Sequence, residues 1–548
     1  MTTMVINAPR EGGMTSEERL VIFASSLGTV FEWYDFYIYG TLGAFLAKYF
    51  FSNVPPNVGF IFALLAFAAG FAVRPFGALI FGRLGDMIGR KYTFLITMTL
   101  MGIGTFFIGV IPGFATWGIL APIVLIALRL VQGLALGGEY GGAAIYVAEH
   151  SPKNRRGYYT SWIQTTATLG LFMALLLVLG IRTSMGEPAF AGKPDVFWAG
   201  WRIPFLLSAI LLAVSIWIRL KLNESPLFRR MVQEGKQSKR PLTEAFGNWN
   251  NAKIAIFALL GATAGEAVVW YGGQFYALFF LTLTAKVPAV TAQILIAVSL
   301  ALGTPFFIVF GILSDKIGRK PIILAGFALA VVTYFPIFQG LIHFTNPKLE
   351  AALASAPVTV IADPAECSFQ FNPVGTAKFT TSCDIAKSAL VARSVNYANE
   401  AAPAGAKASV KVGDQTISAT APDFAKQLGD AITKHGYPAS ANPAEINYVM
   451  TVVLLTILVI YVTLVYAPIA AWLVELFPTR IRYSGLSLPY HIGNGWFGGF
   501  LPATVFAIVA ATGNIYSGLW YPIVVAAMSF VIGLIFLPET KDRDITHI

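Results

Sequence analysis

The chain has 548 residues, of which 56% are hydrophobic and only 12% are charged. Soluble proteins average about 25% charged residues, and a water-soluble fold could not hide this much apolar surface. The composition therefore excludes a soluble globular protein. We attribute the formal net charge of +10 to Lys and Arg in the loops that set the orientation of a protein in a lipid bilayer. We therefore expect no binding of nucleic acid.

The first twenty residues are polar and include Arg10, Glu11 and Arg19. They lack the short apolar core and the small-residue cleavage site of a secretory signal. We therefore expect the N-terminus to be retained and to lie in the cytoplasm.

Apolar runs near the length of about 20 residues that a bilayer requires recur along the whole chain. An even number of spans places both termini on one side, and Lys and Arg gather in the loops of that side, as expected for cytoplasmic loops. The fold class is therefore an all-α integral membrane protein. Its twelve predicted spans are 20–50, 58–82, 92–112, 118–149, 157–181, 201–221, 253–283, 290–313, 321–343, 447–476, 484–511 and 515–537.

An internal repeat divides the chain into two halves. The sequence GRLGDMIGRK at 82–91 returns as GILSDKIGRK 229 residues later, at 311–320. A second pair, with Glu, Pro and Arg at the same spacing, begins at Glu149 and at Glu475, 326 residues apart. The difference between the two offsets predicts an insertion of about 100 residues in the second half.

The inserted segment is residues 344–446, which are rich in Ala, Pro, Asp, Lys and Ser and interrupt the apolar rhythm. By parity it is periplasmic, which is a compartment where a disulfide between Cys367 and Cys383 persists. Two free thiols remain the alternative, because spacing does not decide geometry. Short alternating runs at 408–412 and 416–419 suggest strands, and either a tolerated insertion or a substrate-capturing domain fits.

The predicted domains follow from the repeat and the insertion. They are an N-terminal six-helix bundle at 1–222, a central cytoplasmic loop at 223–252, a C-terminal six-helix bundle at 253–343 and 447–548, and the periplasmic insert at 344–446.

The paired loops at 82–91 and 311–320 resemble the signature loop of the major facilitator superfamily. This resemblance implies two six-helix bundles around a central cavity. The two aspartates can accept from backbone donors at a facing helix N-terminus, and such loops resemble latches that hold one gate closed. The gating residues expected here are Asp86, Arg90, Asp315 and Arg319.

Further segments resemble the metabolite:proton symporter family, which implies import of carboxylates, proline or betaine together with protons across the bacterial inner membrane. The segments are FEWYDF at 31–36, RPFG at 74–77, RLVQG at 129–133, GGE at 137–139, WRIPF at 201–205, NESP at 223–226 and ELFPTR at 475–480.

Ionisable side chains in the bilayer core cost on the order of 3 kcal/mol or more and need a partner or a task. Glu32 and Asp35 lie roughly 18 to 22 Å into the first span and share one helix face. Two such carboxylates repel each other, so they are candidates to carry the coupling proton. Arg129 reaches a similar depth and is expected to hold these carboxylates or an anionic substrate. A permanent ion network that fastens the spans together is the alternative.

Other polar residues complete the predicted sites. Glu139 is a further proton-coupling candidate, and Arg74 and Glu139 are expected to form a gate-locking salt bridge. Four further residues flank the inner ends of spans four and ten and are predicted to latch the bundles: Glu149, Arg156, Glu475 and Arg482. Substrate-binding candidates besides Arg129 are Gln132, Gln164, Glu266, Tyr271, Gln274 and Asn494.

Enzyme chemistry finds no support, because the sequence contains no phosphate-binding loop with Gly-Lys-Ser/Thr and no Cys/His cluster with metal spacing. We expect no cofactor and no metal. The predicted function is proton-coupled import of a small organic solute by a monomer in the lipid bilayer. Uptake of a zwitterion such as proline or betaine, a drug-type efflux antiporter, and a non-transporting sensor on a transporter scaffold are the alternatives.

Overall fold

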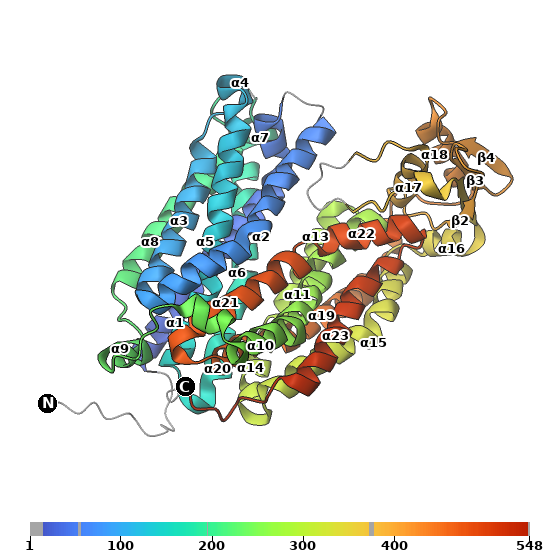
Figure 1. The fold of residues 1–548 in the computed structure, drawn as a ribbon. Coiled ribbons are helices and arrows are strands. Elements are labelled where there is room, and N and C mark those ends of the chain that lie inside the picture. The colour runs from blue at the N-terminus through green and yellow to red at the C-terminus, as the bar shows by residue number, and fades with distance from the viewer. Residues whose placement is uncertain (1–14, 53–55, 194, 372–377, 546–548) are drawn as a thin grey trace.

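The computed structural model describes residues 15–52, 56–193, 195–371 and 378–545. The chain forms two groups of long helices and a smaller α/β unit at one end (Figure 1). Residues 1–14, the larger part of the polar N-terminal segment predicted to be cytoplasmic, lie outside the described residues.

The first half of the chain folds into six long helices. Helices are expected here, because in lipid a spanning segment must satisfy its backbone polar groups internally. They are α1 (Ser16–Phe50), α2 (Pro56–Met87), α3 (Arg90–Val110), α5 (Leu120–His150), α6 (Arg156–Met185) and α8 (Ile203–Leu220), with the short α4 (Phe114–Trp117) and α7 (Glu187–Ala191) between them.

The second half repeats this pattern with more irregular helices, several of which contain π-helical turns. Its six helical segments contain α10 (Trp249–Ala258), α11 (Ala264–Tyr271) and α12 (Ala277–Phe279); α13 (Ala289–Gly303) and α14 (Pro305–Ile317); α15 (Arg319–Thr345); α19 (Tyr448–Tyr466) and α20 (Ile469–Leu476); α21 (Arg482–Ile492) and α22 (Leu501–Thr512); and α23 (Trp520–Phe536).

Ten helical segments of the described chain are long and apolar enough to cross a membrane. The helices α1 and α2, with 35 and 32 residues, make twelve. The predicted number of spans is thus confirmed, and the boundaries differ from the prediction by a few residues, because several helices continue beyond the apolar core into polar turns.

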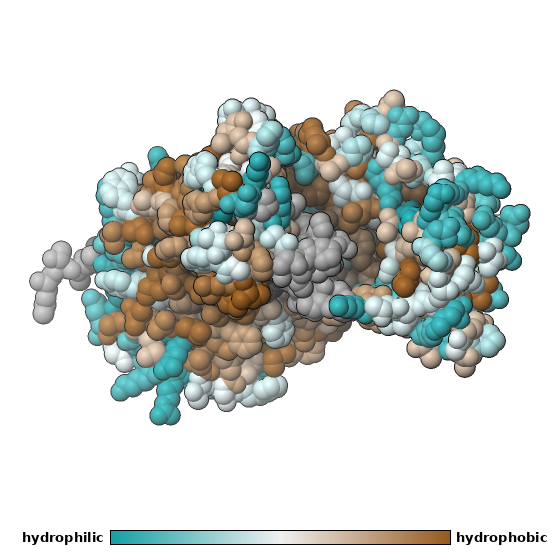
Figure 2. Space-filling view, turned by 90° about the horizontal axis from the view of Figure 1, so that it is seen from above, coloured by the Kyte–Doolittle hydropathy of each residue, from teal (hydrophilic) through white to brown (hydrophobic). Residues whose placement is uncertain are grey.

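The two groups of helices converge at the end that carries the C-terminus and diverge toward α4 and the inserted unit (Figure 1). We call these the latch end and the insert end. Between the halves, residues 223–252 contain the short helix α9 (Pro226–Gln233) and a π-helical turn η3 (Thr243–Gly247). Seen from the insert end, hydrophobic residues cover the flanks of the helices, while hydrophilic residues gather on the insert (Figure 2).

The insert between α15 and α19 is a compact unit with one four-stranded sheet. The strands are β1 (Val358–Ala362), β2 (Ala398–Ala401), β3 (Ser409–Val412) and β4 (Gln415–Ser418), in the order β2-β1-β3-β4, with β1 and β2 parallel and the other pairs antiparallel. The helices α16 (Pro347–Ser355), α17 (Ser382–Val391) and α18 (Phe424–Lys434) accompany it. The alternating runs correctly indicated β3 and β4, whereas β1 and β2 were not predicted.

Cys367 and Cys383 are joined by a disulfide, with 5.2 Å between their Cα atoms. The insert is hydrogen-bonded to the C-terminal half at several points. The Tyr397 amide donates to the Gly513 carbonyl at 2.8 Å, and Lys286 donates from Nζ to the Ala392 carbonyl at 2.6 Å. These bonds fix the unit to the connections that follow α12 and α22.

Candidate transport site and latch

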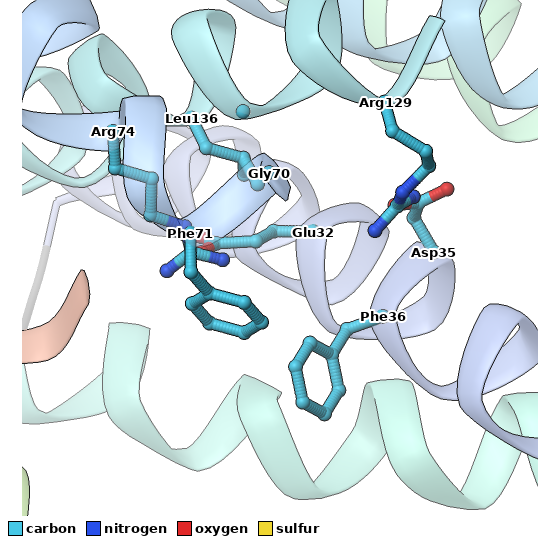
Figure 3. Close-up of a pocket in the computed structure, with 9 residues that line it drawn as sticks. Glu32, Asp35, Phe36, Gly70, Phe71, Arg74, Arg129 and Leu136 are labelled. Carbon is cyan, nitrogen blue, oxygen red and sulfur yellow. The ribbon is translucent and has the colours of Figure 1, made fainter. Parts of the chain in front are cut away.

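A small cavity lies among the helices of the N-terminal half, at the level where α1, α2 and α5 meet (Figure 3). Its volume is about 10 Å³, which is close to the least that a single water molecule needs. This cavity is therefore too small for an organic solute in the state described here. The lining residues are Glu32, Asp35, Phe36, Gly70, Phe71, Arg74, Arg129, Gly133 and Leu136.

Asp35 forms the tightest ion pair at this cavity. Arg129 donates from Nη1 to its Oδ2 at 2.9 Å, and Thr105 and Gln132 donate to its Oδ1 at 2.8 and 2.9 Å. The Arg129 guanidinium also lies 4.2 Å from the centre of the Tyr39 ring. The sequence predicted that Arg129 meets the carboxylates of the first span, and the structure brings it to Asp35. Gln132, a predicted substrate ligand, here supports this pair.

The second carboxylate of the first span has a different partner. Glu32 lies 3.9 Å from Arg74, and Arg74 rests 4.4 Å above the ring of Phe71. The distance between Glu32 and Arg74 is at the upper limit of an ion pair and exceeds that of a charge-assisted hydrogen bond. Glu32 is therefore held less firmly than Asp35.

The predicted pairing of Arg74 with Glu139 is wrong in this structure. Glu139 lies 3.4 Å from Arg219 and accepts a hydrogen bond of 3.2 Å from Thr97. Arg219 lies near the end of the predicted span 201–221, yet it is only 1% exposed. Because α8 runs to Leu220 and packs against α3, the side chain of Arg219 enters the bundle and leaves Arg74 to Glu32.

The C-terminal half contributes a second polar group around Glu266. Asn494 donates from Nδ2 to Glu266 Oε2 at 2.9 Å. Nearby, the hydroxyls of Tyr466 and Tyr490 are 2.7 Å apart, and the Tyr490 ring stacks on Tyr140 of the N-terminal half at 3.7 Å. Gln164 donates to the Tyr140 hydroxyl at 2.8 Å. Glu266 and Asn494 thus lie together, whereas Gln164 instead supports a tyrosine.

Aromatic side chains separate the two polar groups and join the halves. Trp33 lies 4.5 Å from Trp270 and Phe36 lies 4.9 Å from Phe275, measured between ring centres. Tyr271, a predicted substrate contact, packs edge-on against Phe71 at 6.2 Å. Gln274, which was also predicted to contact the substrate, is buried on the same helical segment. This aromatic layer occupies the space between the halves at mid-depth.

The signature aspartate of the first half closes one latch. Asp86 accepts hydrogen bonds from the backbone amides of Tyr483 and Ser484, at 3.1 and 2.8 Å, near the beginning of α21. Arg90 lies 2.7 Å from the same carboxylate and donates to the Thr479 carbonyl. A carboxylate is well placed here, because a helix N-terminus presents free amides and a positive dipole end.

The equivalent aspartate of the second half closes a matching latch. Asp315 accepts from the amides of Gly157 and Tyr158 at 2.8 Å each, near the beginning of α6. Arg319 lies 2.6 Å from it. The two latches are related by the internal repeat, because each signature loop receives the helix start of the opposite half.

Buried ion pairs between the halves reinforce these latches. Glu149 lies 2.6 Å from Arg482, and Arg156 lies 3.3 Å from Glu475. Arg319 also lies 3.1 Å from Glu475. The glutamate of each repeat motif thus pairs with the arginine of the motif in the other half. The molecule is therefore closed at the latch end.

Two glutamates of the latch end were missed from the sequence. Glu224 accepts from the amides of Arg90 and Lys91, and Glu539 accepts from the amides of Arg319 and Lys320. Each covers the N-terminus of the helix that follows a signature loop. A further repeat would have revealed them, since Leu222-Asn-Glu-Ser matches Leu537-Pro-Glu-Thr.

This arrangement of two six-helix halves with paired latches is the major facilitator fold. A solved structure of the proton:xylose symporter XylE, bound to 6-bromo-6-deoxy-D-glucose, superimposes with a TM-score of 0.60 at 14% sequence identity, covering 97% of this chain and 98% of that one.

The family model for sugar (and other) transporters matches residues 20–305 and 430–548. The proline/betaine transporter of Salmonella typhimurium is 36% identical over 335 residues, which cover 59% of this chain and 66% of that protein, just under two thirds of its length. The shikimate transporter of Escherichia coli is 34% identical over 347 residues, with 62% and 76% covered. The chain therefore belongs to the sugar (and other) transporter family, and it is a multi-pass membrane protein.

Proposed function

We propose that the chain imports a small, carboxylate-bearing organic metabolite together with protons. The observation that carries this proposal is the buried ion pair of Asp35 with Arg129 at the cavity, with the looser pair of Glu32 and Arg74 beside it. Ionisable side chains inside a membrane helix bundle mark proton or substrate pathways. The relatives named for proline/betaine and for shikimate support a carboxylate-bearing solute.

The coupling step is an exchange of partners at Asp35. A proton bound to Asp35 removes its negative charge and releases Arg129, which then offers a guanidinium to a substrate carboxylate in bidentate geometry. When the substrate leaves, Arg129 returns to Asp35 and displaces the proton. Glu32 and Arg74 form a second, weaker pair that can open in the same way.

The transport cycle alternates access between the two ends of the molecule. We propose that the latch end faces the cytoplasm of a bacterial inner membrane, with both termini there, and that the insert is periplasmic. In the state described here the latches are shut toward the cytoplasm. Import requires the amides of α6 and α21 to leave Asp315 and Asp86, while the aromatic layer separates to admit the solute. We further propose that one chain acts as a monomer.

A zwitterion is favoured over a simple anion by the pairing of the arginines. Because Arg74 and Arg129 are both matched by carboxylates, the cavity carries little excess positive charge. An anion would therefore enter a nearly neutral site, to which a solute with both charges is better suited.

Uptake into proteoliposomes tests the proposed function. Purified protein is reconstituted and offered labelled shikimate, 2-oxoglutarate, proline and glycine betaine, with the outside made acidic relative to the lumen. We expect at least one of these solutes to accumulate, and a protonophore to abolish accumulation. Protein that is correctly inserted but accumulates none of them under the gradient would overturn the proposal and favour a sensor or an exporter.

Topology is tested separately by labelling single cysteines. In a variant with Cys367→Ser and Cys383→Ser, one cysteine replaces Lys236 in the central segment or Lys426 in the insert, both of which are exposed. An impermeant thiol reagent applied to intact spheroplasts should modify the second position only. Modification of the first position from outside would reverse the proposed orientation.

A further inference from the structure

Among the described residues, each acid at mid-depth pairs with an arginine, with a single exception. Glu32, Asp35 and Glu139 are matched by Arg74, Arg129 and Arg219. The remaining acid at this depth is Glu266, and no ion pair among the described residues includes it. A charge without a partner is expensive in a membrane interior, so Glu266 either stays neutral or receives a cation from elsewhere.

Glu266 is held at one oxygen and open at the other. Asn494 donates to Oε2, which fixes the orientation of the carboxylate, whereas Oε1 is buried without a hydrogen-bond partner among the described residues. The side chain is 0% exposed. The indole N–H of Trp270, one helical turn further along α11, is also buried without a partner in the described chain. Buried polar groups in this condition mark sites that a ligand or water completes.

Glu266 lies across the aromatic layer from the charged cavity of the N-terminal half. Its carboxylate and that of Glu32 both interact electrostatically with the hydroxyls of Tyr271 and Tyr466. The hydroxyl of Tyr140, which belongs to the N-terminal half, also interacts electrostatically with both carboxylates. The lone acid therefore faces the region between the halves rather than a lipid-facing surface.

Aromatic faces lie next to this acid. Trp270 packs 4.5 Å from Trp33 and 6.4 Å from Tyr466, and Tyr271 follows it directly on the same helical segment. The π faces of tryptophan and tyrosine attract cations, including quaternary ammonium groups that donate no hydrogen bonds.

We propose that Glu266, oriented by Asn494, binds the positively charged group of the transported solute, while an arginine of the N-terminal half binds its carboxylate. The inference rests on the proposed transport function and narrows its substrate class to zwitterions that carry an ammonium or quaternary ammonium group. Each half then supplies one charge, so a solute that bridges them draws the halves together. A dianion would meet repulsion from Glu266 and is excluded from the class.

Binding to purified protein tests this inference. Wild type, Glu266→Gln and the control Glu400→Gln, which removes an exposed acid on the insert, are compared at one pH with labelled glycine betaine, proline and shikimate. We expect Glu266→Gln to weaken glycine betaine and proline binding at least tenfold and to leave or strengthen shikimate binding. The control should match wild type, and Glu266→Asp should recover part of the loss.

Other outcomes overturn the inference in distinguishable ways. Unchanged zwitterion affinity combined with a changed dependence of transport on pH would make Glu266 a proton site. Equal weakening of zwitterion and anion would give Glu266 a packing role, which a lowered melting temperature would reveal. A wild-type protein that binds shikimate but neither zwitterion would overturn this inference alone, whereas one that binds none of the three would overturn the proposed function itself.

Discussion

The two halves of the molecule share a fold and a latch but differ in how they treat buried charge. At mid-depth the N-terminal half contains three acids, each matched by an arginine. The C-terminal half contains Glu266, whose carboxylate accepts a hydrogen bond from the neutral amide of Asn494. Matched pairs can exchange partners when a proton arrives, whereas an unmatched acid must either stay protonated or receive a cation from a ligand. From this difference we infer that the first half couples transport to protons and that the second half recognises the cation of the solute.

Removal of Arg129 should have the largest effect on the protein, because it breaks the matching in the N-terminal half. Arg129→Ala leaves Asp35 buried without its cation, which costs about 3 to 5 kcal/mol when a buried pair is broken. We expect a strongly lowered melting temperature and loss of substrate binding. The double variant Asp35→Asn with Arg129→Gln removes both charges and should recover most of the stability. Arg182→Ala, at an exposed ion pair, serves as the control, and an equal loss there would contradict the account.

A single substitution at Arg482 should open the latch, because this arginine of the C-terminal half pairs with Glu149 of the N-terminal half. Arg482→Gln leaves Glu149 buried and unmatched in the closed state, which shifts the population toward a state open at the latch end. Spin labels at Arg83 and Lys316, both exposed and on opposite halves, report this by their separation in a cysteine-free background. We expect a longer distance than in the variant Arg480→Gln, whose exposed arginine lies outside the buried network. Identical distance distributions would remove Arg482 from the latch.

Removal of the insert should affect the C-terminal half more than the N-terminal half, because the insert is hydrogen-bonded to the C-terminal half. Replacement of residues 350–440 by a short Gly/Ser linker should leave a membrane-inserted carrier with measurable uptake, because the repeat is complete without this unit. The variant should be less stable to heat, because Lys286 and Gly513 lose their partners. Normal insertion with loss of substrate binding would show that the insert is part of the substrate path.

The smallest expected effect is the response of the insert to acid. Hydrogen bonds from Lys407 and Ser382 lower the pKa of Glu366 below its usual 4.5. Because the pKa is lower in the folded unit than in the unfolded chain, this group stabilises the unit above pH 4.5, and the contribution is lost as the pH falls through the lower folded value. The protection factors of the β3 amides, which correct hydrogen exchange for its intrinsic pH dependence, should therefore fall below pH 4.5, and less steeply in Glu366→Gln. An unchanged slope in that variant would exclude Glu366 as the cause.

The sequence allowed the twelve spans, the repeat, the insertion and the latch loops to be predicted, because lipid imposes a length on each helix and duplication repeats each motif. Asp86 and Asp315 were also expected to face helix N-termini, because the positive end of a helix dipole attracts a carboxylate. These features depend on spacing along the chain, which a single sequence contains.

The pairing of buried charges could not be predicted, because it depends on the rotation of each helix about its axis and on which helices are neighbours. The predicted pairing of Arg74 with Glu139 rested only on their similar depth in the bilayer. Arg219 was not considered as a partner, because a residue at the end of a span is expected to be exposed. The strands β1 and β2 were missed, since β2 is exposed at all four positions and β1 lies in a segment without strict alternation. The capping roles of Glu224 and Glu539 were not predicted, although Glu224 lies in the NESP segment and the repeat that relates the two residues was present in the sequence.

The division of tasks between the halves is tested most directly by comparing Asp35→Asn and Glu266→Gln in one proteoliposome assay. Each variant is measured for accumulation driven by external acid and for counterflow of labelled against unlabelled solute, which needs no net proton movement. We predict that Asp35→Asn loses accumulation and keeps counterflow. Glu266→Gln should require about tenfold more solute in both modes yet remain gradient-dependent. Accumulation by Asp35→Asn with undiminished dependence on the proton gradient would contradict the account and return the coupling proton to Glu32 or Glu139.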